Sequence, residues 1–255
     1  MKKERLFKEY IKACLDKDQI CGLGNPDADI LIIGQEHFAP QDDLSDEKWK
    51  ELLLKNYNFC NQYDINANYI KPKGDIDDSG RLIRRNPTWC NYQDLLDSVY
   101  CRHSRQPNML DFEYYAFTTE LNSKPKPTSN ATNKKEKQEV YNRISERLIL
   151  LRESEFIKTF PVIILACGPY VVNQKEKGLL QINDTFNVVY DEELGPNGIP
   201  EGWHQKGKMW FTTHHNPNDK TKLVIHTWQL SRKNKALLNE MAGIIRYHLH
   251  QLGLL

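Results

Sequence analysis

Asp29-Ile-Leu-Ile-Ile-Gly34 is a short, continuous apolar run that contains three isoleucines. Such a run is typical of a strand that is buried on both faces, as in a parallel sheet covered by helices. The turn-forming stretch Cys21-Gly-Leu-Gly-Asn-Pro-Asp-Ala28 precedes it, and the polar residues Gln35 and Glu36 follow it. We therefore predict a buried strand over residues 29–34 with a polar carboxyl end.

Three more apolar runs follow this one along the chain. They predict strands over residues 114–121, 161–167 and 208–213, and a further edge strand is indicated over 183–190. One helix is expected to begin at an Asn133 cap, and a last helix is expected to begin near Ser231. Strands that alternate with helices predict a three-layer α/β/α sandwich with a mainly parallel sheet of four to five strands, and we expect residues 1–255 to form a single domain.

The composition is that of an ordinary soluble globular protein, with 39% hydrophobic residues, 27% charged residues and a net charge of +1. So small a net charge argues against binding nucleic acid by bulk charge, and any DNA contact would need a local basic patch. No signal-peptide core and no run of eighteen apolar residues is found, which predicts a cytoplasmic protein without a membrane span. The six cysteines contain no Cys-X-X-Cys pair and are expected to be reduced thiols.

Common cofactor and metal motifs do not fit this sequence. Gly22-Leu-Gly24 precedes a strand, whereas a dinucleotide fingerprint follows one and opens a helix. The sequence holds neither a P-loop nor a Gly-X-Ser-X-Gly elbow. Cys101-Arg-His103 and His214-His215 are weak metal candidates, because adjacent residues of an extended chain point apart. We therefore predict no metal ion and no cofactor.

Polar side chains follow each predicted strand. Gln35 and Glu36 follow the first, Asn122 closes the second, Gly168-Pro-Tyr170 follows the third, and His214-His-Asn-Pro217 follows the fourth. Ligands of an open parallel sheet bind beyond the carboxyl ends of its strands, so we expect these groups to share one crevice. Taken singly, Glu36 is also explained as a helix cap, Asn122 as a turn residue and His214 as an ordinary core or surface histidine.

Two of these strand ends resemble the motifs of the uracil-DNA glycosylase superfamily. Gly24-Asn-Pro-Asp-Ala-Asp-Ile-Leu-Ile-Ile-Gly-Gln-Glu36 is similar to the first strand and motif, where an apolar strand ends in a Gly-Gln-Asp-Pro-Tyr type of loop. Thr213-His-His-Asn-Pro217 resembles the second motif, His-Pro-Ser-Pro. The resemblance implies a fold of that family and excision of uracil or a related damaged pyrimidine from DNA after base flipping.

The resemblance also implies roles for individual residues. Glu36 falls on the catalytic Asp of the first motif, and Gln35 on the acidic or amide residue of other branches of the family. His214 falls on the histidine that binds the base oxygen O2, and whether His214 or His215 faces the pocket is left open. Asn122 is placed like the asparagine that reads the base edge. Phe38 or Phe59 would stack on the extruded base.

Contacts with DNA would come from loops beside these strand ends. The candidates are Lys124, Lys126, Asn216, Lys220 and Lys222, with Arg81, Arg84 and Arg85 as a second basic patch. A surface that is merely solvated is the alternative explanation for the lysines. We expect a monomer, and leave open whether single-stranded or double-stranded DNA is bound.

A second function stays open at this point. His37 stands where the family prefers Pro, and His215-Asn216 replaces Pro-Ser of the second motif. These departures favour a catalytically inactive module that binds nucleic acid, a nucleotide or a protein partner. The retained carboxylate, amide and imidazole favour the enzyme.

Overall fold

The computed structural model describes the backbone of most of the chain. The described ranges are 2–38, 45–62, 71–72, 74–76, 82–85, 87–102, 109–126, 134–174, 178–193, 198–231 and 234–255. Some side chains within these ranges fall outside the description, among them those of Glu36, His37, Phe38 and Lys126.

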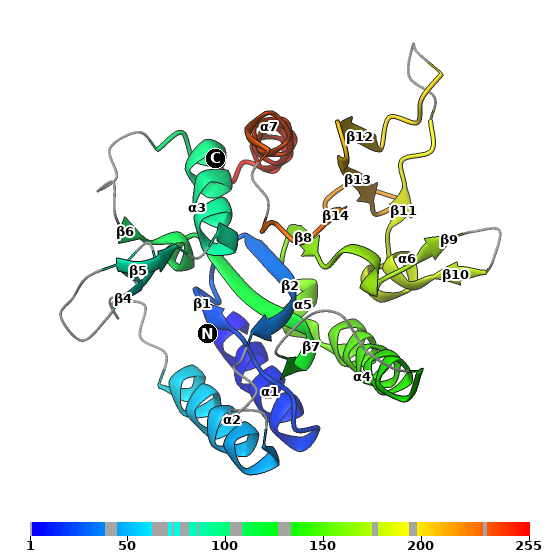
Figure 1. The fold of residues 1–255 in the computed structure, drawn as a ribbon. Coiled ribbons are helices and arrows are strands. Elements are labelled where there is room, and N and C mark those ends of the chain that lie inside the picture. Colours follow the sequence, from blue (N-terminus) through cyan, green and yellow to red (C-terminus); the bar gives the residue numbers. More distant parts are fainter. Residues whose placement is uncertain are drawn as a thin grey trace.

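A mixed sheet of eight strands lies at the centre of the molecule (Figure 1). Four neighbouring strands run parallel in the order β7-β2-β8-β14. Antiparallel strands extend both edges: β1 pairs with β7, β13 pairs with β14, and β11 and β12 both pair with β13. The bounds are β1 (Leu23–Gly24), β2 (Ile30–Phe38), β7 (Ala116–Lys126), β8 (Val162–Ala166), β11 (Val189–Tyr190), β12 (Trp203–Lys206), β13 (Met209–His215) and β14 (Leu223–Thr227).

Helices cover both faces of this sheet (Figure 1). One face packs against α1 (Lys2–Asp16), α2 (Asp46–Asn61), α4 (Lys134–Glu153), α5 (Glu155–Lys158) and α6 (Gln181–Phe186), and the other against α3 (Pro87–Val99) and α7 (Lys235–Gln251). Because side chains alternate along a strand, Leu31 and Ile33 of β2 join the first core and Ile30 and Ile32 join the second. All four are fully buried, as a run with no polar residue requires.

Short elements complete the described structure. They are the pairs β3 (Lys71–Pro72) with β6 (Met109–Leu110), β4 (Gly74–Ile76) with β5 (Leu82–Arg85) and β9 (Asn173–Gln174) with β10 (Leu179–Leu180), and the 3-10 turns η2 (Phe112–Tyr114) and η3 (Gly168–Tyr170).

The structure confirms the α/β class, with helices on both sides of a central sheet, and the strands expected over 29–34, 114–121 and 161–167 correspond to β2, β7 and β8. The expected sheet of four to five strands is wrong, because short antiparallel strands enlarge it to eight. The edge strand expected over 183–190 is also largely wrong, because 181–186 form α6 and only Val189–Tyr190 is a strand.

The fourth predicted strand needs a further correction. Residues 208–213 do belong to a strand, β13, but β13 runs antiparallel to the parallel core. The strand that lies parallel to β8 is β14, which the sequence analysis did not predict. Only residues 216–222 connect β13 to β14. That connection is shorter than the dozen or so residues that a parallel crossover needs, so the two strands form an antiparallel pair.

Arg147 of α4 fixes the carboxyl half of β7. Its side chain is fully buried, and its guanidinium donates hydrogen bonds to the Glu120 carbonyl (3.1 Å), the Thr119 hydroxyl (2.7 Å) and the Tyr10 hydroxyl (3.0 Å). A buried guanidinium is tolerated only when its donors are satisfied, and here they tie α4 to α1 and β7. We infer that this network fixes the position of the carboxyl end of β7 relative to α1 and α4.

Candidate functional site

The carboxyl ends of the four parallel strands meet at one edge of the sheet, which we call the carboxyl edge. Gln35 and Asn122 are both buried there, and the backbone of Glu36 pairs with Asn122. The side-chain oxygen of Asn122, Oδ1, accepts a hydrogen bond from Arg143 Nε (3.2 Å). Asn122 is therefore at the predicted strand end, and α4 holds its side chain in place. The side chain of Glu36 lies outside the described residues.

A second carboxylate, Glu120, lies at the same edge. It packs over Gly34, where an added Cβ would come within 2.3 Å of Glu120 Oε2, so residue 34 can carry no side chain without moving Glu120. Burial and the nearby Glu120 charge hold the pKa of Tyr92 well above its ordinary value. Burial also raises the pKa of the Cys167 thiol, so that Tyr92 and Cys167 stay protonated near neutral pH.

His214 and His215 do not lie at the carboxyl edge, and this part of the predicted site is wrong. His214 of β13 pairs with Val224 of β14, which pairs with Ile163 of β8. On the next two strands the paired residues at the same level are Leu31 of β2 and Phe117 of β7. Asn122 is five residues beyond Phe117, or about 16 Å farther along the strand direction. The cause is the antiparallel direction of β13, whose carboxyl end lies at the amino end of β14.

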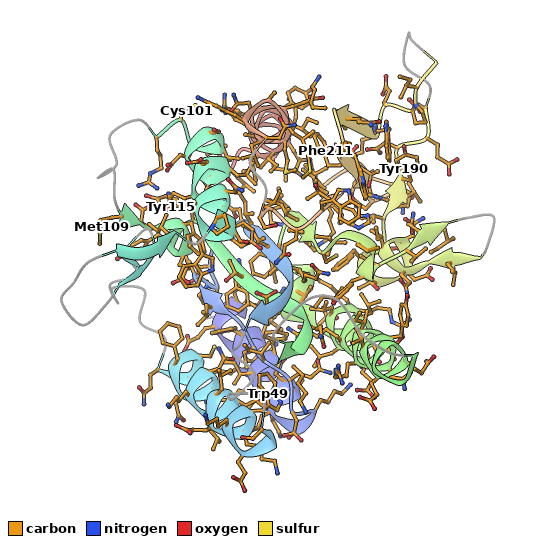
Figure 2. The ribbon with its side chains drawn as sticks, viewed as in Figure 1. Trp49, Cys101, Met109, Tyr115, Tyr190 and Phe211 are labelled. Carbon is orange, nitrogen blue, oxygen red and sulfur yellow. The ribbon has the colours of Figure 1, made fainter. Side chains whose placement is uncertain are left out.

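A pocket of about 390 Å³ opens where β8 and β14 end and continues over β13, and we call it the aromatic pocket. Its walls are Tyr190, Trp203, Trp210, Trp228, His214 and His226, together with the turn that begins at Gly168. Tyr190 reaches it from β11, beside β13, whereas Phe211 of β13 belongs to the core on the opposite face (Figure 2). The side chain of His214 thus does line a pocket with aromatic walls, but Asn122 is not part of that lining.

Two imidazoles lie in this pocket in their neutral form. Burial lowers the pKa of His226, whose Nε2 donates to the Gly168 carbonyl (2.8 Å). Burial, reinforced by His226, lowers the pKa of His214 to about 3. His214 Nε2 bonds the Thr212 hydroxyl (3.0 Å), while its buried Nδ1 has no hydrogen-bond partner among the residues that the structure places. A buried ring nitrogen without a partner is costly, so a polar group of a ligand would stabilise it.

Three indoles form one wall of the pocket, and we call them the indole row. Trp203 stacks on Trp210 with ring centroids 5.5 Å apart, and Trp228 meets Trp210 edge-on at 6.1 Å. Gly168 makes room for the last of them: its φ is +53°, and a Cβ there would lie 2.9 Å from Trp228 Cε3. Trp203 and Trp228 remain 37% and 40% exposed, respectively.

A larger pocket of about 1030 Å³ lies on the other side of β11, and we call it the acidic pocket. Its described lining holds four carboxylates and one lysine: Asp191, Glu192, Glu193, Glu201 and Lys220. His215 also lines it and donates from Nδ1 to Asp191 (2.9 Å), which accepts a second bond from the Thr213 hydroxyl (2.6 Å). The two pockets share Asn173 and Tyr190.

The residues expected to contact DNA are scattered. Asn216 and Lys220 line the acidic pocket, and Lys222 donates to the carbonyls of Lys158 (3.0 Å) and Phe160 (2.8 Å) at the amino end of β14. Their predicted position beside the carboxyl edge is therefore wrong. Lys124 is on β7 at that edge, while the side chains of Lys126, Arg81, Arg84 and Arg85 lie outside the described residues.

Phe59, one of the two predicted stacking residues, is not part of the described lining of the aromatic pocket. Phe59 is on α2 and is 38% exposed, and the side chain of Phe38 lies outside the described residues. The structure supplies His226 and Trp228 instead, which the sequence analysis missed. A signal for them existed: Leu223-Val-Ile-His-Thr227 is a five-residue run rich in β-branched residues, and an aromatic residue follows it.

The chain matches no protein-family model and no curated protein. In the part of the chain that the structure describes, no group of three or more His, Cys, Asp or Glu side chains is arranged to hold a metal ion. The described helices include none with the length and apolar character needed to cross a membrane.

Proposed function

We propose that this protein is a DNA base-excision glycosylase that hydrolyses the N-glycosidic bond of uracil or a related damaged pyrimidine. It would act as a monomer, without a metal ion or cofactor, on a base flipped into the aromatic pocket. The observation that carries the proposal is that pocket: indole walls and two neutral imidazoles beside the carboxyl ends of β8 and β14.

The proposal includes a fold of the uracil-DNA glycosylase type. Its support is the parallel core β7-β2-β8-β14 with helices on both faces, and the polar groups gathered at the carboxyl edge. Within this proposal His226 takes the strand-end position of the second-motif histidine, while His214, whose Nδ1 has no described partner, would contact the base oxygen. His226 belongs to an apolar strand that ends at the carboxyl edge, as that motif requires, and His226-Thr-Trp-Gln229 stands where His-Pro-Ser-Pro would.

The pocket chemistry suits a flat heterocycle. A pyrimidine would stack against an indole and present its carbonyl and N–H groups to the imidazoles. In hydrolysis the bond from C1′ to the base nitrogen breaks, and the base leaves with the electron pair. Water adds to C1′ and gives up a proton. A histidine N–H directed at the base oxygen would stabilise the negative charge that develops on the leaving base.

Glu36 is the proposed partner of the sugar. Its backbone lies at the carboxyl end of β2, beside Asn122. Its carboxylate would stabilise the positive charge on the sugar or orient the attacking water. Asn122 lies outside the described lining of the aromatic pocket, and its side chain is held by Arg143. Its role in the proposal would be to position the end of β7 beside Glu36.

A base-binding module without catalysis is the second candidate. One observation favours it: among the described side chains that line the aromatic pocket there is no Asp or Glu. Such a module would bind a uracil-containing strand in the same pocket and leave its glycosidic bond intact.

The deciding experiment is incubation with oligonucleotides that carry one uracil, followed by alkali cleavage at abasic sites. We expect cleavage by the wild type, and Glu36→Gln should reduce the rate on the order of 100-fold or more, because it removes the charge beside the sugar. Glu201→Gln in the acidic pocket is the matched control and should leave the rate unchanged. Binding of the oligonucleotide without any cleavage would favour the module.

A further inference from the structure

The two outer rings of the indole row remain partly exposed at the rim of the aromatic pocket. Trp203 and Trp228 lie on either side of Trp210, at the rim of the aromatic pocket, and each presents more than a third of its surface. Exposed aromatic surface beside a pocket marks a binding surface, because burying it against a ligand is favourable. Rings at the rim are placed to contact what flanks a base bound in the pocket.

We propose that this rim binds unpaired DNA, with Trp203 and Trp228 stacking on the bases next to the one in the pocket. The proposal rests on the glycosylase function above and names the substrate class of the same site. Stacking on aromatic side chains is how proteins hold single strands without reading their sequence, since every base has a π-face. In a duplex these base faces are covered by their neighbours in the stack.

The charges around the pocket also favour a single strand. The acidic pocket adjoins the aromatic pocket, shares Tyr190 with it, and carries four carboxylates against one lysine among the described residues. The second strand of a duplex would bring additional phosphates close to these carboxylates. With a net charge of +1 for the whole chain, stacking must supply most of the affinity.

The occupant of the aromatic pocket is a base rather than an organic cation. An aromatic cage next to carboxylates also attracts quaternary ammonium groups. However, the described lining of the aromatic pocket contains no carboxylate, and its polar groups include two neutral imidazoles, the Thr212 hydroxyl and the Asn173 amide. These groups offer hydrogen bonds, including the unpartnered His214 Nδ1, and a quaternary ammonium group has no N–H to use them.

The test measures binding by fluorescence anisotropy with one uracil-containing oligonucleotide, used as a single strand and in a duplex. We expect the single strand to bind on the order of tenfold tighter or more, because a paired base must first be unstacked and unpaired. Trp203→Ala and Trp228→Ala should each weaken single-strand binding by about 5- to 100-fold, the stacking contribution of one base. The matched Phe variants keep a ring and should restore much of the affinity.

A salt series and a control variant complete the design. Between about 50 and about 200 mM KCl the affinity should fall by less than about tenfold, whereas six to ten phosphate contacts would lose about 10³- to 10⁵-fold. Tyr247→Ala removes an aromatic side chain that is 67% exposed on α7, away from the pocket, and should leave binding unchanged.

The outcomes separate this inference from the proposed function. Single-strand preference that depends on both tryptophans supports the inference, even if no uracil is released and the glycosylase function fails. Excision from duplex as fast as from single strands, with Trp203→Ala and Trp228→Ala unaffected, overturns the inference and keeps the glycosylase. Tryptophan fluorescence that responds to tetramethylammonium but not to either DNA, at matched ionic strength, overturns both.

Discussion

The two pockets beside β13 carry different chemistry, although they draw on neighbouring residues of that strand. His214 points into the aromatic pocket, where burial and His226 lower its pKa to about 3 and the described lining has no carboxylate. His215, the next residue, points to the other face and pairs with Asp191 in the acidic pocket. Alternation along the strand therefore places one imidazole in a neutral aromatic site and the other in a charged polar one.

The amino end of β14 differs from the carboxyl edge in a second way. Burial lowers the pKa of Lys222 to about 8, and its amino group is occupied by the carbonyls of Lys158 and Phe160. The Lys222 amino group at that end thus binds neighbouring backbone, whereas in the aromatic pocket His214 Nδ1 has no described partner. The difference predicts that substitutions in the aromatic pocket change activity, and that substitutions at the other end change stability.

The largest expected effect compares the histidines by substitution with alanine. His214→Ala should lower kcat for uracil excision by about 100- to 1000-fold, because it removes a ring nitrogen without a described partner that can donate to the leaving base. His226→Ala should cost less, because the single N–H of neutral His226 is occupied by the Gly168 carbonyl. His215→Ala should leave kcat close to that of the wild type, since its ring lines the other pocket. Single-turnover kinetics measure the effect, and circular dichroism checks that each variant is folded. Equal losses in all three variants would remove the distinction between the two pockets.

Asp191→Asn tests whether the carboxylate of Asp191 in the acidic pocket stabilises the fold. Burial opposes ionisation of Asp191, but hydrogen bonds from His215 and Thr213 outweigh it and hold the pKa of the carboxyl below its ordinary value. A carboxyl with a lowered pKa in the folded state adds stability above its unfolded pKa, near about 4, and loses it as the pH falls through the folded value. At pH 7 the variant should therefore lose about 1–3 kcal/mol of unfolding free energy.

Urea unfolding at a series of pH values measures this effect. The difference in unfolding free energy between wild type and Asp191→Asn should be largest near neutral pH. It should shrink in acid as the wild-type carboxyl becomes protonated. A gap that stays constant down to acid pH would mean that the charge of Asp191 does not stabilise the fold. Uracil excision by this variant should stay close to the wild-type rate.

Much of the fold follows from local pattern. The run at residues 29–34 predicts β2 because its residues are buried on both faces, and the same reasoning holds for β8. Strand direction is not local information, and β13 shows the consequence. Its apolar pattern predicts a strand equally well in either direction, and only the short connection of residues 216–222 decides that it runs antiparallel.

The site was less predictable because it depends on that direction. Gln35, Asn122 and Gly168 lie where strand-end reasoning places them, since β2, β7 and β8 are parallel. His214 was assigned to the carboxyl edge on the assumption that β13 was parallel too, and His226 was missed with β14. The indole row could not have been predicted from sequence, because Trp203, Trp210 and Trp228 come from three different segments that meet only in the folded sheet.

The smallest expected effect compares two glycines, Gly168 of the aromatic pocket and Gly207 of the turn between β12 and β13. Both have positive φ, +53° and +63°, so alanine at either position is strained by about 1–2 kcal/mol. At Gly207 an added Cβ meets no atom within 4 Å, but at Gly168 it would lie 2.9 Å from Trp228 Cε3. Gly168→Ala should therefore destabilise the protein by about 1 kcal/mol more than Gly207→Ala, the lower end of the range for overpacking.

Gly168→Ala should also weaken single-strand binding, because Trp228 must move, while Gly207→Ala should leave binding unchanged. Urea unfolding and anisotropy measure both effects. Equal losses of stability in Gly168→Ala and Gly207→Ala, together with unchanged binding, would show that Trp228 can shift without cost. The position of Trp228 in the indole row would then not matter for binding.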